Sequence, residues 1–171
     1  MKQLKDAIEI RKSRRKYIPI PLKSTDADSL SSLISELNTT GSIKMRLVLD
    51  DGDAFNGFRK SYGMLSGVKS YVALIGKKDD YQTQEKLGYY GEWLILHATA
   101  LGLGTCWVGG TFDRNSCLVE LNADERIVCA ITVGNVEENL SGKERFIHRL
   151  THRKSKTIDQ MYISEIMINN D

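Results

Sequence analysis

The 171-residue sequence predicts a single domain of the α/β or α+β class. Its composition, with 41% hydrophobic and 27% charged residues and only 2 prolines, is that of a globular protein. Stretches with helical periodicity alternate with short apolar stretches that are typical of buried strands. No apolar run approaches the roughly 18 residues of a membrane-spanning helix, and the N-terminal residues lack an apolar signal core, so we expect a cytoplasmic protein.

Helical periodicity is clearest over residues 85–103, where apolar side chains surround the helix on nearly all sides. Such a helix must be buried on most sides, either in the core or against a second subunit. The other expected helices cover residues 3–12, residues 24–41, and a stretch from residue 113 or 115 to about 121.

Alternating or continuous apolar stretches predict four strands, at residues 45–49, 71–76, 105–108 and 126–134. Residues 54–61 are expected to form a short helix or a loop. For residues 158–168 the pattern is consistent with either a terminal helix or a strand.

Basic residues concentrate in two stretches near opposite ends of the sequence. Residues 11–16 contain five basic residues in six, and residues 143–156 contain six more, so the two stretches hold 11 of the 24 lysines and arginines. If the fold brings them together, they form a cationic site suited to a phosphomonoester. Two solvated faces, or a nucleic-acid surface, are the alternatives. The net charge of only +2 and the lack of a basic recognition helix disfavour nucleic acid.

Side chains that could catalyse a reaction unaided are sparse. His97 lies within the apolar helix and Cys106 lies in an apolar setting, so structural roles are favoured for both. Glu92 is a single carboxylate with no paired partner in the sequence, and no spacing typical of metal ligands appears. The Gly109-Gly110 turn is either a simple turn or bare backbone that a planar ligand can approach closely. If the protein is an enzyme, we expect a bound cofactor to carry its chemistry.

Two stretches resemble the FMN-dependent nitroreductase family, and especially its short branch. Residues 10–17, Ile-Arg-Lys-Ser-Arg-Arg-Lys-Tyr, are similar to the family's Arg-x-Ser-x-Arg/Lys-x-aromatic signature. Residues 91–110 are similar to its helix, glycine-rich turn and flavin-facing strand. A weaker match, residues 153–159, is similar to the basic stretch near the family's C-terminus.

The resemblance implies an α+β fold with a central mixed sheet flanked by helices, in an intertwined homodimer that binds FMN at the subunit interface. It also implies a ping-pong oxidoreductase. NADH or NADPH gives a hydride to FMN and leaves, and a nitroaromatic, quinone or similar acceptor is then reduced. The expected partners are a second copy and small molecules, without nucleic acid, membrane or metal. The alternatives are a flavin-binding sensor or carrier without efficient turnover, and a small basic binding module without a cofactor.

The same resemblance implies which residues bind FMN, with none acting as a catalytic side chain. The phosphate and ribityl group would be bound by Arg11, Lys12 and Ser13, and the phosphate site closed by Arg153, Lys154 and Lys156. Arg15 would lie near the N1/O2 edge of the flavin. The ring would be lined from the partner subunit, with a backbone N–H near N5, by Trp107, Val108, Gly109 and Gly110. Many family members carry an acidic residue where this chain has Gly109. For the side chain that reads the flavin edge, the candidates are Asn56 and Ser61.

Overall fold

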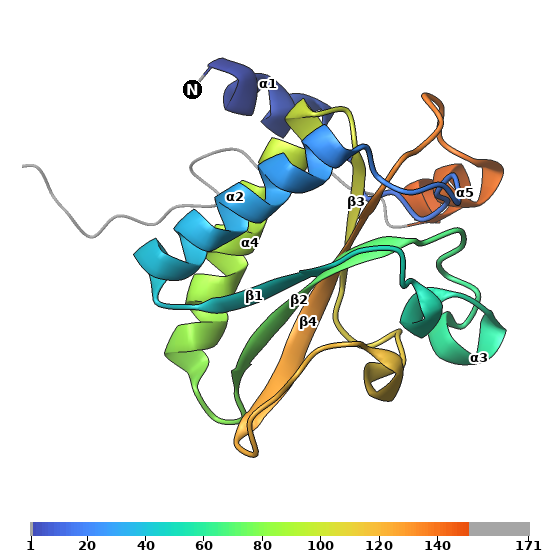
Figure 1. The fold of residues 1–171 in the computed structure, drawn as a ribbon. Helices are drawn as coiled ribbons and strands as arrows, with labels where there is room; N and C mark the ends of the chain where they lie inside the picture. Colours follow the sequence, from blue (N-terminus) through green and yellow to red (C-terminus); the bar gives the residue numbers. More distant parts are fainter. Residues whose placement is uncertain (1, 151–171) are drawn as a thin grey trace, which may run out of the picture. The chain divides into compact units, whose positions relative to one another are not determined.

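The computed structural model describes residues 2–150 of the chain, which combine helices with one sheet, as an α+β fold requires (Figure 1). The elements follow the order α1 (Lys2–Ile10), α2 (Ser24–Gly41), β1 (Lys44–Val48), η1 (Asp53–Phe55), α3 (Phe58–Ser61), β2 (Ser70–Lys77), α4 (Tyr81–Ala100), β3 (Gly104–Val108), η2 (Arg114–Ser116), β4 (Glu125–Gly134) and α5 (Gly142–Leu150). The chain divides after Asn139 into two compact units. The first contains the sheet, and the second contains α5. Among the helices of residues 2–150, none has the length and apolar character needed to cross a membrane.

The sheet has the strand order β1-β2-β4-β3, so β2 and β4 are central and β3 lies at an outer edge. All three pairings between neighbouring strands are antiparallel. We expected a mixed sheet. Within the described residues, the parallel component comes from two isolated bridges, Ser13 with Thr105 and Lys16 with Ser66. The N-terminal segment thereby adds a short parallel contact to the edge of β3.

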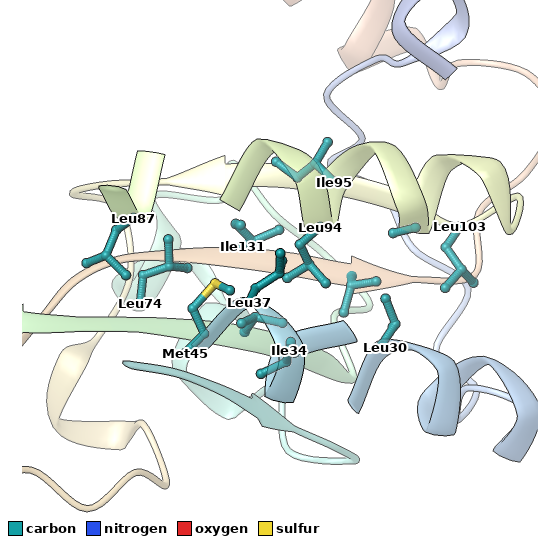
Figure 2. Packing of buried hydrophobic residues seen from close by; sticks show 13 residues of the cluster. Leu30, Ile34, Leu37, Met45, Leu74, Leu87, Leu94, Ile95, Leu103 and Ile131 are labelled. Atoms are coloured by element: carbon teal, nitrogen blue, oxygen red, sulfur yellow. The ribbon is translucent and has the colours of Figure 1, made fainter. Parts of the chain in front are cut away.

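Helices α2 and α4 pack on one face of the sheet and bury the larger apolar cluster there (Figure 2). The residues that meet at this face include Leu30, Ile34 and Leu37 of α2, Leu87, Leu94 and Ile95 of α4, and Met45, Leu74 and Ile131 of the sheet. A second cluster contains Tyr17, Phe55, Tyr71, Val108 and Phe112. Neighbouring residues of β2 alternate between the two clusters, which places the clusters on opposite faces. Each large side chain contributes about 1.5–3 kcal/mol when fully buried.

The four predicted strands and the helices of residues 3–12, 24–41 and 85–103 are confirmed, with shifted ends. Helix α4 begins earlier than expected because the Asp80 side chain accepts a hydrogen bond from the Thr83 N–H (3.0 Å) and caps it. The expected helix up to residue 121 is wrong, since only the three-residue turn η2 forms. Beyond this turn the chain extends, and the Leu118 N–H donates to the Tyr71 hydroxyl instead of to a helical carbonyl. The prediction for residues 158–168 lies outside the described residues.

Candidate functional site at the edge of the sheet

The basic segment after α1 lies along the outer edge of β3. Ser13 forms a parallel bridge with Thr105, and the Arg14 N–H donates to the Thr105 carbonyl (2.8 Å). The edge of β3 is open to this contact because its other side pairs with β4. The short stretch that carries most of the N-terminal positive charge is thereby fixed beside the strand that leads to the Gly109-Gly110 turn.

Tyr17 anchors the far end of this segment. Its ring is buried in the second apolar cluster, and its hydroxyl lies 2.7 Å from the Thr132 hydroxyl of β4. The same hydroxyl donates to the Arg14 carbonyl (2.8 Å), while the Tyr17 N–H donates to the Ser66 carbonyl (2.9 Å). A buried aromatic side chain that also satisfies its hydroxyl group fixes the backbone on either side of it. The aromatic position at the end of the Arg-x-Ser-x-Arg-x-Tyr stretch is therefore an anchor for the basic residues before it.

Glu92 of α4 joins the basic segment to β3. The Glu92 Oε1 lies 3.2 Å from the Nε of Arg11, and its Oε2 accepts a hydrogen bond from the indole Nε1 of Trp107 (2.9 Å). The Arg11 side chain is 23% exposed and that of Glu92 is 41% exposed, so the ion pair is partly solvated. An arginine has five N–H donors, and this contact uses the Nε, so Arg11 can bind a further acceptor.

Gly91 lets the Trp107 indole lie directly against α4. A Cβ at this position would stand 2.4 Å from the Cη2 of Trp107 and 3.2 Å from the Cδ2 of Leu74, closer than atoms approach without a shift. The Trp107 indole can therefore lie this close to α4 only because Gly91 has no side chain. The position of the ring in turn sets where its N–H reaches Glu92.

The chain leaves β3 through Gly109 and Gly110, which are both exposed. A Cβ built on either residue would meet no atom within 4 Å, and neither residue has a positive φ. The fold therefore does not itself require glycine at these two consecutive positions. Bare backbone facing open space is what a flat ligand needs for close approach.

The structure brings together, in one chain, two groups of residues that the family resemblance assigns to different subunits. Ser13 forms a bridge with Thr105, and Arg11 is joined to Trp107 through Glu92. No partner subunit is required to join the basic segment to β3. The three C-terminal basic candidates, Arg153, Lys154 and Lys156, lie outside the described residues, so the convergence of the two basic stretches stays a prediction.

Asn56 and Ser61, the candidates for the flavin edge, form hydrogen bonds with the backbone of neighbouring residues. The Asn56 amide donates to the carbonyls of Gly52 (2.9 Å) and Val68 (2.8 Å) and accepts from the Val68 N–H (3.1 Å). Ser61 is buried, and its hydroxyl donates to the Gly57 carbonyl (3.2 Å). Both side chains therefore stabilise the loop between β1 and β2.

Histidine and cysteine take structural places, as expected from their apolar settings. The His97 Nε2 lies 2.8 Å from the Ser29 hydroxyl and links α4 to α2, and burial lowers the pKa of this imidazole. Cys106 is buried in β3. We therefore build the candidate site from the charged side chains and the bare glycine backbone at the edge of β3, and not from His97 or Cys106.

The sequence does not place two residues in this site, Arg114 and Glu92, of which Glu92 is recognised there only as a single carboxylate. Glu92 meets Arg11 across 81 positions of the chain, and no local pattern signals such a contact. The Arg114 Nη2 donates to the Gly109 carbonyl (2.5 Å) from within a stretch that was expected to be helical. The wrong helix assignment concealed that this arginine returns to the glycine turn.

Comparison with known proteins identifies the family of this chain. A family model described as "Putative TM nitroreductase" matches residues 3–171, so the chain belongs to this nitroreductase family. Comparison with curated protein sequences gives no significant match.

Solved structures have a similar fold at low sequence identity. A nitroreductase family protein from Clostridium difficile 630 is 16% identical, with a TM-score of 0.64 over 94% of this chain and 96% of that chain. NfrA1 from B. megaterium is 15% identical, with a TM-score of 0.67 over 95% of this chain and 74% of its own. A third, described as a putative nitroreductase in complex with FMN from Desulfovibrio desulfuricans, is 18% identical, with a TM-score of 0.63 over 95% of this chain and 96% of that chain.

Proposed function

We propose that this protein is a cytoplasmic, homodimeric, FMN-dependent oxidoreductase. NADH or NADPH supplies a hydride, and a nitroaromatic, quinone or similar acceptor receives it. The observation that carries the proposal is the continuity of the β3 edge, with a basic segment paired at Thr105 and a bare glycine turn at its end. Family membership and a similarly folded protein described in complex with FMN support the choice of cofactor.

The dimensions of the edge fit a flavin mononucleotide. Gly109 follows Thr105 by four positions, which corresponds to about 13 Å along a strand. A dianionic phosphate at the basic end and a planar ring at the glycine end match the two chemistries that this edge offers. Oriented donors of arginine, lysine and serine hold a phosphate more specifically than a diffuse patch of charge does. The residues present therefore fit FMN.

We assign the phosphate and ribityl group to Arg11, Lys12 and Ser13, with Arg153, Lys154 and Lys156 completing the phosphate site. Lys12 is exposed at the start of the segment, and Ser13 is held in place by its bridge to Thr105. Arg15 is assigned to the pyrimidine edge of the ring, where a fixed positive charge favours negative charge on the ligand.

We assign the ring to Trp107, Val108, Gly109 and Gly110. Val108 is only 3% exposed and packs into the second apolar cluster, so its backbone is the part that can face a ligand. Gly109 and Gly110 offer unobstructed peptide groups. When bound, FMN supplies the hydride-accepting and hydride-donating chemistry, and the chain supplies position and electrostatic field.

The exposed aromatic side chains of α4 support the homodimer. Tyr89 is 61% exposed and Trp93 is 42% exposed, and residues four apart share one face of a helix. Helix α4 therefore buries one face in its own chain and leaves an aromatic face for a second copy.

The purified protein, reconstituted with FMN, tests the proposal directly. We expect the visible absorption bands of bound oxidised flavin, and bleaching of these bands by NADH or NADPH that a quinone or nitroaromatic reverses. A protein that neither retains nor responds to FMN contradicts the proposal. Retention of FMN without oxidation of either nucleotide supports a flavin carrier or sensor instead.

Two substitutions test the phosphate assignment. Arg11→Ala and Ser13→Ala should each weaken FMN binding by about tenfold, the loss expected for one charge-assisted hydrogen bond. Arg126→Ala and Ser31→Ala are matched controls, because both residues are exposed and lie away from the β3 edge, on β4 and α2. Fluorescence titration measures the dissociation constants, and equal values for all four variants and the wild type contradict the assignment.

A further inference from the structure

Arg114 holds the peptide group of the glycine turn. Its Nη2 donates to the Gly109 carbonyl (2.5 Å), and its Nε donates to the Ile127 carbonyl of β4 (3.2 Å). The guanidinium carbon lies 4.6 Å from the centre of the Phe112 ring. One side chain thus connects the turn, the central strand β4 and an aromatic ring of the core. The planar fork of arginine suits such a contact because its donors are fixed relative to one another.

The stretch that carries Arg114 is itself rigidly held. Phe112 is buried and stacks on Phe55 with ring centres 5.3 Å apart. The Asp113 N–H donates to the Ala54 carbonyl (3.0 Å), and the Asp113 carboxylate accepts from the Ser116 hydroxyl (2.6 Å). These contacts fix the position of the backbone that leads into Arg114. The side chain then reaches back five residues to the turn, where a Cβ on Gly109 or Gly110 would meet no atom within 4 Å.

The contact determines the direction of one N–H group. The peptide bond between Gly109 and Gly110 is trans and planar, so its carbonyl and its N–H point in opposite directions. With the Gly109 carbonyl held on Arg114, the Gly110 N–H faces away from that arginine. Within residues 2–150 this N–H donates to no acceptor. It is an oriented donor at the bare backbone where a flat ligand can approach.

The family resemblance already implies a backbone N–H near N5 of bound FMN. We propose that Arg114 is the positioning residue for this contact, because it orients the Gly109–Gly110 peptide so that the Gly110 N–H is the donor. This inference rests on the proposed function, since it needs a flavin at the turn. It also explains how a chain with glycine at position 109 fixes this peptide without a side chain on the residue itself. Two adjacent glycines without a tether would lose more conformational freedom when a ligand binds.

The test compares the FMN complexes of the wild type, Arg114→Met and Arg114→Lys, with Arg126→Met as the control for lost surface charge. The first readout is the 15N chemical shift of N5 in 15N-labelled FMN, which reports a hydrogen bond to that atom. The second is the dissociation constant of FMN. We expect Arg114→Met to move the N5 shift towards that of unbound FMN and to weaken binding by about three- to tenfold, as for one lost hydrogen bond.

Arg114→Lys retains the charge and one possible donor, so it should restore part of the N5 shift, and Arg126→Met should match the wild type. An unchanged N5 shift in a folded Arg114→Met protein overturns the inference while leaving the proposed function intact. A wild type that does not bind FMN overturns the proposed function first. If Arg114→Met does not fold, the NMR chemical shift of the Gly110 amide proton in the wild type tests the inference instead. This chemical shift should change strongly when FMN binds, and an unchanged chemical shift overturns the inference.

Discussion

The Glu92 carboxylate joins Arg11 to Trp107, with one oxygen 3.2 Å from the Arg11 Nε and the other accepting the Trp107 indole N–H at 2.9 Å. A single acidic side chain on α4 thus aligns the first cation of the basic segment with the aromatic residue of β3. Since the carboxylate is 41% exposed, water competes for both contacts.

A double-mutant cycle over Arg11→Ala and Glu92→Ala should give a coupling free energy of about 0.2–1 kcal/mol, the range for partly exposed ion pairs. The coupling should fall as salt is added, because solvent ions screen the pair. Urea unfolding of the four proteins at low and high salt measures it, with Glu36→Ala on the exposed face of α2 as the single-site control. A coupling that does not change with salt contradicts an electrostatic link.

Gly91→Ala should destabilise the protein by about 1–3 kcal/mol, because the new methyl group overlaps the Trp107 ring. Gly88→Ala is the matched control on the same helix, since a Cβ there meets nothing within 4 Å. It should stabilise the protein by up to about 1 kcal/mol through helix propensity. Thermal or urea unfolding compares the two variants. Equal effects in the same direction contradict the close contact between α4 and the indole.

Trp93→Asp should dissociate a homodimer while leaving the subunit folded. The Trp93 side chain is 42% exposed in the single chain, so its replacement opens no large cavity in the core. A charge at an apolar subunit interface, by contrast, is strongly unfavourable. Sedimentation measures the oligomeric state and circular dichroism the fold. A wild-type protein that sediments as a folded monomer rules out the dimer itself.

His97 should make the protein less stable in mildly acidic solution. Burial lowers the pKa of its imidazole below the ordinary value of about 6.5, so the folded state favours the neutral ring. This contribution is complete above the unfolded pKa and is lost as the pH falls through the folded one. Urea unfolding between pH 7 and 5 should therefore show a smaller loss for His97→Gln than for the wild type. NMR titration of His97 should find its pKa below that of a solvent-exposed histidine.

The sequence predicts the strands and the long helices well because their apolar periodicity is strong and local. It predicts residues 113–121 poorly, because the Ser116 hydroxyl donates to the Asp113 carboxylate and stabilises a short turn. Apolar periodicity carries no information about such a polar contact. At the candidate site, the signature residues and the glycine turn are visible in the sequence. The residues that position them, Glu92 and Arg114, are not, since each acts through a contact made only by the folded chain.

The bridge of Ser13 to Thr105 also bears on how the molecule avoids aggregation. An outer strand with unpaired N–H and carbonyl groups is a template for pairing with another chain, and here the Arg14 N–H already occupies the Thr105 carbonyl. The segment proposed to hold the phosphate thereby also caps one margin of the sheet. Deleting residues 1–16 would expose that margin, and the shortened chain would self-associate through it.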